Sequence, residues 1–168
     1  AMLGSMEDTL EMSKAIKGIL PCIDFAHLHA RPGDGTMNTV KEWSGILEAY
    51  QKALGKDALK HLHIHLSGIE YGPKGEKNHL ALGESDLKLN YLFEVLKDFG
   101  CAGRILCESP IMETDSLNMK KAWMKIINMS PAQAVSILPF ATTGTAGLLS
   151  PSDKTKLDTY ASIDRFKG

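Results

Sequence analysis

Alternating histidine and aliphatic residues form the most distinctive stretch of the chain. The stretch reads His61, Leu62, His63, Ile64, His65 and Leu66. Successive side chains of a β-strand point to opposite faces of its sheet, so this pattern predicts a strand with imidazoles on one face and aliphatic side chains on the other. Two further apolar runs, residues 19–24 and 103–108, predict two more strands.

Apolar residues at helical spacing predict four helices around these strands. The helices are expected at residues 7–17, 39–54, 86–98 and 115–129. We expect Asn38 and Ser85 to cap the second and third helices, and Trp43 and Tyr50 to pack in the core. Strands and helices therefore alternate, which favours an α/β fold with a parallel sheet.

Two segments between these elements are expected to be loops, residues 26–38 and 67–85. The second is long for a connection in an α/β protein, and long loops in compact domains are usually functional or disordered. It carries four ligand-type side chains, which favours a functional role: Glu70, Glu76, His79 and Glu84.

Side chains able to bind metal follow the predicted strands. Asp24, His65 and Glu108 stand at three strand ends, and the carboxyl ends of parallel strands share the rim where α/β proteins place their sites. Two carboxylates and an imidazole suit zinc or manganese. The alternatives are structural: Asp24 and His27 as a hydrogen-bonded pair, and Glu108 bound to a backbone amide or a lysine.

Composition narrows the function classes. The chain has 168 residues and a net charge of −1, which excludes a strongly basic nucleic-acid-binding surface overall but leaves a local patch open. No apolar run is long enough for a membrane span and no signal peptide is visible. The three cysteines lack metal-binding spacing, so we expect buried, reduced thiols in a cytoplasmic protein.

Four ordered motifs carry a family resemblance. They are the stretches 20–27 (LPCIDFAH), 63–68 (HIHLSG), 75–79 (GEKNH) and 107–110 (CESP). On these motifs, residues 7–127 resemble the endonuclease IV family of apurinic/apyrimidinic endonucleases, among the xylose-isomerase-like TIM barrels. The resemblance implies an eight-stranded barrel with a trinuclear zinc site, of which this segment matches strands five to seven. We therefore expect a partial (β/α) barrel.

The resemblance also implies a ligand set and a substrate. Position by position, Asp24, His65 and Glu108 match the ligands of one zinc ion, and His27 and His79 match those of another. The implied substrate is abasic-site DNA, hydrolysed at a phosphodiester bond. His61 and His63 match no ligand, and they are expected to be solvated or to line the barrel interior.

One position departs from the family pattern. The family places an aspartate two residues before His79, and this chain has Lys77 there, with Glu76 as a substitute. The other family ligands would lie upstream of residue 1, so we expect a partial site and an inactive chain. Surface cations such as Arg31 and Lys74 either contact phosphate or only solvate a face.

The two ends of the chain differ in character from its middle. Residues 1–6 resemble a vector-derived scar, and the appendage 128–168 contains a segment, 132–160, that resembles bacteriophage tail fibres. These parts suggest a chimera, and a non-catalytic, artificially recombined protein that folds and self-associates is the alternative function. The open edges of a partial barrel predict a homo-oligomer, most simply a dimer.

Overall fold

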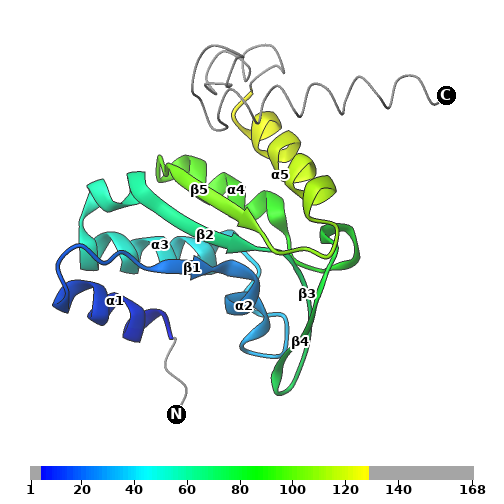
Figure 1. The fold of residues 1–168 in the computed structure, drawn as a ribbon, viewed down its shortest axis with the longest axis horizontal. Helices are drawn as coiled ribbons and strands as arrows, with labels where there is room; N and C mark the ends of the chain where they lie inside the picture. Colours follow the sequence, from blue (N-terminus) through cyan, green and yellow to red (C-terminus); the bar gives the residue numbers. More distant parts are fainter. Residues whose placement is uncertain (1–4, 129–168) are drawn as a thin grey trace, which may run out of the picture. The chain divides into compact units, whose positions relative to one another are not determined.

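The computed structural model describes residues 5–128, so the tail-fibre-like segment predicted at 132–160 lies outside the described residues. Helices and strands follow along the chain as drawn in Figure 1: α1 (Met6–Ala15), β1 (Cys22–Asp24), α2 (Phe25–Ala30), α3 (Val40–Leu54), η1 (Lys56–His61), β2 (Leu62–Leu66), β3 (Gly68–Gly72), β4 (Gly75–Leu80), η2 (Leu82–Glu84), α4 (Leu89–Asp98), β5 (Gly103–Cys107) and α5 (Met112–Ile126).

A parallel three-stranded sheet in the order β1-β2-β5 forms the centre of this part of the chain. Its register pairs Asp24 of β1 with His65 of β2, and His65 with Leu106 of β5. The three strands expected from the sequence are all present and all parallel, as their alternation with helices requires. The predicted α/β fold is therefore confirmed.

The core lies on one face of this sheet, against α3 and α4. Leu62, Ile64 and Leu66 of β2 are buried there, in one cluster with apolar residues of both helices, among them Trp43, Leu47, Tyr50, Leu92, Phe93 and Leu96. The alternation of residues 61–66 explains this arrangement, because each aliphatic side chain that enters the core turns its histidine neighbour to the opposite face. Trp43 and Tyr50 are core residues, as expected.

The segment expected to be a long loop contains an antiparallel hairpin instead. Strands β3 and β4 pair from Gly68 with Leu80 to Gly72 with Gly75, and Pro73 and Lys74 form the turn between them. Gly75 has a φ of 96°, which glycine adopts without strain. A two-residue turn between glycines is a hairpin signal that the alternation of long helices and strands obscured. The hairpin extends from the carboxyl-end side of the sheet (Figure 1).

Helix starts also differ from the expectation. Residues 25–30, expected within a loop, form α2 directly after β1. Thr39, not Asn38, caps α3, in a capping box with Glu42. The Asn38 side chain instead donates to the carbonyl of Asp86 (2.9 Å) and accepts from the amide of Lys88 (2.8 Å), which ties the start of α3 to that of α4. Because α4 begins at Leu89, Ser85 is not its cap.

A buried histidine fixes α2 to the hairpin. The side chain of His29 is fully buried. Its Nδ1 donates to the carbonyl of Met37 at 2.8 Å, and its Nε2 lies 2.8 Å from Oδ1 of Asp86. Tyr71 of β3 donates to the other oxygen of Asp86 at 2.6 Å. Donation to this carboxylate, together with burial, raises the pKa of Tyr71 to about 12. The network therefore holds the hairpin against the helix that follows β1.

Two residues assigned to a vector-derived scar take part in the fold. Ser5 forms a capping box with Asp8 at the start of α1, and Met6 is buried in the main core cluster. Setting residues 1–6 aside from the fold was therefore wrong for these two, whatever their origin. The expectation that the cysteines are buried holds for Cys107 only, because Cys22 is exposed on β1 and Cys101 is half-buried.

Candidate metal centre

Three strand ends bring a first group of candidate ligands together. Asp24 ends β1, His65 lies beside it on β2, and Glu108 directly follows β5, where its amide donates to the carbonyl of Leu66 at 3.0 Å. One ligand atom of each of these three side chains lies within 4.8 Å of the others. Nδ1 of His65 is 2.8 Å from Oε1 of Glu108. The group, here called the rim group, can therefore hold one ion.

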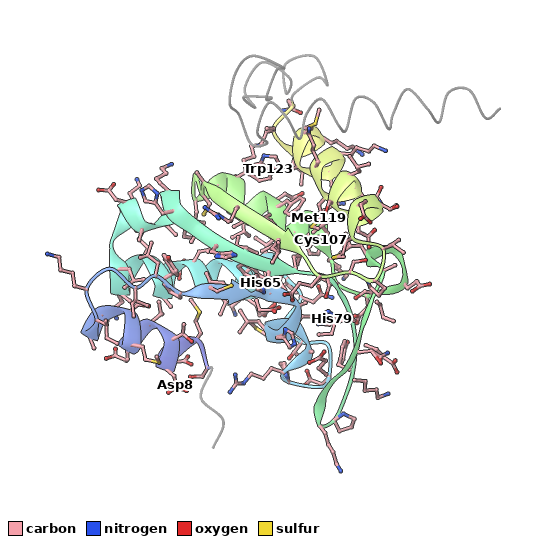
Figure 2. The ribbon with its side chains drawn as sticks, viewed as in Figure 1. Asp8, His65, His79, Cys107, Met119 and Trp123 are labelled. Atoms are coloured by element: carbon pink, nitrogen blue, oxygen red, sulfur yellow. The ribbon has the colours of Figure 1, made fainter. Side chains whose placement is uncertain are left out.

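The rim group is accessible from solvent. The side chains of Asp24, His65 and Glu108 retain 25%, 27% and 30% of their exposure. This half-buried state suits metal ligands, because charged carboxylates keep some hydration while an ion can still enter. Figure 2 shows His65 on the sheet and His79 on the hairpin side of it.

A second group of candidate ligands comes from α2 and the hairpin. His27, Glu76 and His79 also have ligand atoms within 4.8 Å of one another. Nε2 of His27 is 2.8 Å from Oε2 of Glu76, and Nε2 of His79 is 3.4 Å from Oε1 of the same carboxylate. Glu76 thus lies between two imidazoles. We call these three residues the hairpin group.

A bulge in β4 explains why Glu76 and Lys77 differ in role. Glu70 pairs with Asn78 and the next residue, Tyr71, pairs with Glu76, so Lys77 is an extra residue on β4. Residues three apart on a regular strand face opposite sides, but one extra residue brings Glu76 and His79 to the same side. Lys77 turns away and its ammonium lies 3.1 Å from Glu70.

Hydrogen bonds orient both histidines of the hairpin group. Nδ1 of His27 lies 2.6 Å from Oδ2 of Asp24, and Nδ1 of His79 donates to the backbone carbonyl of Glu108 at 2.9 Å. Both imidazoles therefore present Nε2 to the group. Metal-binding histidines commonly donate their other ring nitrogen to a carboxylate or carbonyl in this way, which fixes tautomer and orientation.

The charge around His27 favours a cation between its neighbours. Burial lowers the pKa of His27, but its contacts with Asp24 and Glu76 outweigh burial, so the pKa is raised above the usual value. The same two carboxylates would favour a metal ion at this position, and an ion binding to Nε2 would compete with a proton there.

A buried carboxylate holds the loop that carries Glu108. Asp115 of α5 is 1% exposed, accepts from the Ser109 hydroxyl at 2.6 Å and accepts from the amide of Leu82 at 2.8 Å. Burial raises the pKa of Asp115, but these hydrogen bonds outweigh it and the pKa is lowered. The sequence analysis missed this residue. Its one signal was its position in the first turn of a predicted helix, where carboxylates are common.

The two histidines expected to bind no metal, His61 and His63, differ in their surroundings. His61 is exposed at the end of η1, away from the strand on which it was expected. His63 lies on β2 beside Cys22 of β1, its register partner, and these two form a third cluster with His65. The sequence analysis did not consider Cys22 a ligand.

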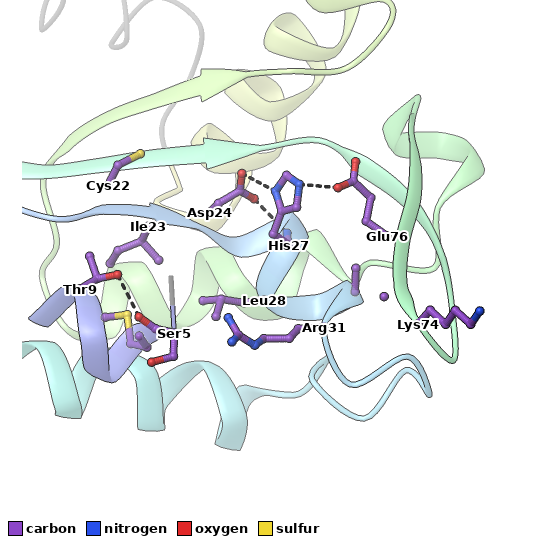
Figure 3. A pocket seen from close by; sticks show the side chains of 13 residues that line it. Ser5, Thr9, Cys22, Ile23, Asp24, His27, Leu28, Arg31, Lys74 and Glu76 are labelled. Carbon is purple, nitrogen blue, oxygen red and sulfur yellow. Dashed lines mark hydrogen bonds and ion pairs between the residues drawn. The ribbon is translucent and has the colours of Figure 1, made fainter. Parts of the chain in front are cut away.

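A pocket of about 470 Å³ opens beside the two groups. Asp24, His27 and Glu76 line one side of it, and the cationic residues Arg31 and Lys74 also border it. Figure 3 shows the chain of contacts from Asp24 through His27 to Glu76 along this pocket. The pocket therefore combines candidate ligands with two cationic side chains.

Among residues 5–128, no helix is long and apolar enough to span a bilayer.

Comparison with known proteins identifies the family. An uncharacterized protein of Methanocaldococcus jannaschii is 42% identical over 123 residues, which are 73% of this chain and 44% of that protein. A probable endonuclease 4 of Oceanobacillus iheyensis is 28% identical over 127 residues, 71% of this chain and 41% of that protein. This chain thus spans less than half the length of these relatives. No solved structure matches significantly. Residues 1–131 match the family described as the xylose isomerase-like TIM barrel, and the chain belongs to that family.

Proposed function

We propose that this chain carries the metal-binding half of an endonuclease that hydrolyses DNA at abasic sites. The observation that carries the proposal is the convergence of the rim group and the hairpin group, joined by the contact between Asp24 and His27. The similarity to a probable endonuclease 4 supports the class of reaction. Zinc is the proposed metal, because imidazole and carboxylate ligands suit it.

The donor set suits such ions, which would replace the contacts that the imidazoles make with Glu108 and Glu76. Each group offers three ligand atoms within 4.8 Å of one another, and three protein ligands leave a position open for water or substrate. When bound, zinc polarises a phosphoryl oxygen and lowers the pKa of a water molecule. Asp24 and Glu108 bring negative charge to one ion, while Asp24 also orients His27 for the other.

The substrate is proposed to approach through the pocket that Figure 3 shows. Arg31 and Lys74 border it and are suited to a phosphate, which guanidinium and ammonium groups bind in charge-assisted hydrogen bonds. The net charge of −1 means that binding of DNA would depend on such local cations and on bound metal, and not on overall charge.

The test combines metal content with cleavage. Protein purified without chelator is analysed for bound zinc and incubated with a duplex that holds one abasic site, beside the same duplex without it. The departures from the family pattern predict an inactive chain, but both ligand groups converge in the structure. We therefore expect zinc to bind, and the abasic duplex alone to be cut. The double variant Asp24→Ala, His65→Ala should lose both properties, and the control His61→Ala should lose neither. Zinc-free protein, or cleavage that survives in the double variant, would refute the proposal.

Exposed apolar side chains favour a second candidate, a non-catalytic protein that self-associates. Ile19, Leu20 and Leu106 are 44%, 47% and 49% exposed, and within residues 5–128 no strand pairs with the outer edges of β1 and β5. Unpaired edges beside apolar surface promote association. We propose a homodimer through this surface. Sedimentation equilibrium tests it: Leu106→Lys should give a monomer, and a wild-type protein that is monomeric at all concentrations would exclude it.

A further inference from the structure

The face of the sheet opposite the core carries a second row of ligand atoms, one step before the rim group. Cys22 precedes Asp24 by two residues on β1, and His63 precedes His65 by two on β2, so all four side chains project from the same face. Cys22 and His63 are register partners, as are Asp24 and His65. In Figure 3, Cys22 and Asp24 point to the same side of β1, and Ile23 points to the other.

The donors of this second row converge as closely as those of the rim group. The Cys22 sulfur and one ring nitrogen each of His63 and His65 lie within 4.8 Å of one another. The rings of His63 and His65 meet edge to face, with centroids 5.2 Å apart. Within residues 5–128, neither Cys101 nor Cys107 belongs to such a group.

The chemistry of these donors differs from that of the rim group. One thiol and two imidazoles form a soft set, which selects thiophilic ions, whereas two carboxylates and one imidazole form a harder set. Cys22 is exposed, so an ion can reach it. Partial burial and the negative charges of Asp24 and Glu108 raise the pKa of the Cys22 thiol, so a metal ion has to displace its proton. The same two carboxylates favour a cation there, while Arg104, the register partner of His63 on β5, opposes it. Arg104 is itself exposed, which lessens its effect through hydration.

We propose that Cys22, His63 and His65 form a separate binding site for a thiophilic metal ion, of the class of Zn²⁺, Cd²⁺ and Cu⁺. His65 belongs to this site and to the rim group, so occupation of one site competes with occupation of the other. Only the competition rests on the proposed function; the thiolate site does not depend on it.

Cadmium titration of the whole chain tests the site, because a thiolate bound to Cd²⁺ gives an ultraviolet charge-transfer band that carboxylates and imidazoles do not. We expect the band to saturate at one ion per chain. Cys22→Ser should abolish it, and His63→Ala should weaken Cd²⁺ binding by more than about tenfold. The matched control Cys101→Ser, a partly exposed thiol outside the group, should retain it. A band that survives Cys22→Ser, or its absence in the wild type, overturns the proposal.

Two further variants separate this site from the rim group. Asp24→Ala and Glu108→Gln remove rim ligands but leave the sulfur and both imidazoles, so the cadmium band should persist even if zinc-dependent cleavage never occurs. Loss of the band in both, with folding intact by circular dichroism, would show that Cys22 shares its ion with the rim carboxylates and would refute a separate site.

Alkylation provides a readout that needs no cysteine variant. Iodoacetamide should modify Cys22, and Zn²⁺ should slow that reaction in the wild type but not in His63→Ala, as followed by peptide mass spectrometry. Equal protection by Zn²⁺ in both proteins would exclude His63 as a ligand and overturn the proposal.

Discussion

Nδ1 of His27 lies 2.6 Å from Oδ2 of Asp24, so a residue of the rim group also orients a residue of the hairpin group. The amide of His27 donates to the other oxygen of the same carboxylate at 2.9 Å, because Asp24 caps α2. The short step from β1 into α2 therefore fixes both residues. The two candidate metal sites are coupled through one side chain.

This coupling predicts unequal effects for two ligand variants. Asp24→Ala removes a rim ligand and the orienting partner of His27, so it should lower zinc binding at both groups. Glu108→Ala removes a rim ligand but keeps the backbone carbonyl that orients His79. Zinc per chain, measured by elemental mass spectrometry after dialysis, should therefore be lower in Asp24→Ala than in Glu108→Ala. Loss of an orienting partner typically costs about 10–100-fold in metal affinity.

Equal zinc content in the two variants would contradict the coupling. His61→Ala is a suitable control, since His61 is exposed and belongs to none of the three clusters.

The bulge in β4 predicts that substitutions at the neighbouring residues Glu76 and Lys77 differ in their effect on zinc binding. Glu76→Gln should lose the ion of the hairpin group, because this carboxylate contacts both imidazoles. Lys77→Gln should leave metal binding unchanged, because Lys77 faces Glu70 instead. Isothermal titration with zinc measures both. If Lys77→Gln alters zinc affinity as much as Glu76→Gln does, the bulge does not separate Glu76 as a ligand from Lys77 as a bystander.

Local pattern was enough to predict the sheet. The alternation at residues 61–66 gave one strand, its faces and the side of His63 and His65, because burial of every second residue leaves little freedom. The two other strands were short apolar runs before polar residues, and the parallel order followed from the intervening helices. The ends Asp24 and Glu108 then had to lie on one rim.

Other features of the fold could not be predicted from local pattern, because they depend on contacts between residues far apart in the sequence. Asn38 has a capping side chain, but Asp86 and Lys88 bind it, and that depends on how α4 approaches α3. The hairpin was hidden because β4 carries no alternation of apolar and polar residues, and Lys77 adds a bulge to it. Cys22 was expected to be buried because it lies in a predicted strand and lacks metal-binding spacing, and its exposure follows from facing away from the core.

The lowered pKa of Asp115 predicts that the folded protein loses stability in acid. Because this pKa is lowered in the folded state, Asp115 adds stability above its unfolded pKa of about 3.9, and that contribution is lost as the pH falls below about 4. Asp115→Asn should unfold more easily at neutral pH by about 1–3 kcal/mol, and the difference should shrink as the pH falls. Urea unfolding at several pH values measures this. If the difference in free energy of unfolding between the wild type and Asp115→Asn does not change with pH, the charge of Asp115 does not contribute to stability.

A side chain at Gly103, where β5 pairs with β2, is predicted to destabilise the protein. The φ of Gly103 is 138°, and an added Cβ would overlap the backbone of Leu62. Leu62 begins β2 and pairs with Gly103, so a methyl group there must push the strands apart or strain the backbone. Gly103→Ala should lower the free energy of unfolding by about 1–3 kcal/mol. Thermal unfolding of the whole chain measures it.

Gly45→Ala is the matched control for this substitution. Gly45 lies in the middle of α3, has ordinary helical φ, and would place a Cβ with no atom within 4 Å. Alanine at such a helical position is favoured over glycine by about 0.5–1 kcal/mol, so this variant should be more stable than the wild type. Opposite signs for the same chemical change would show that close approach of β5 to β2, and not the loss of glycine itself, sets the penalty at residue 103. Stabilisation by both substitutions would mean that β5 does not pair with β2 as closely as described.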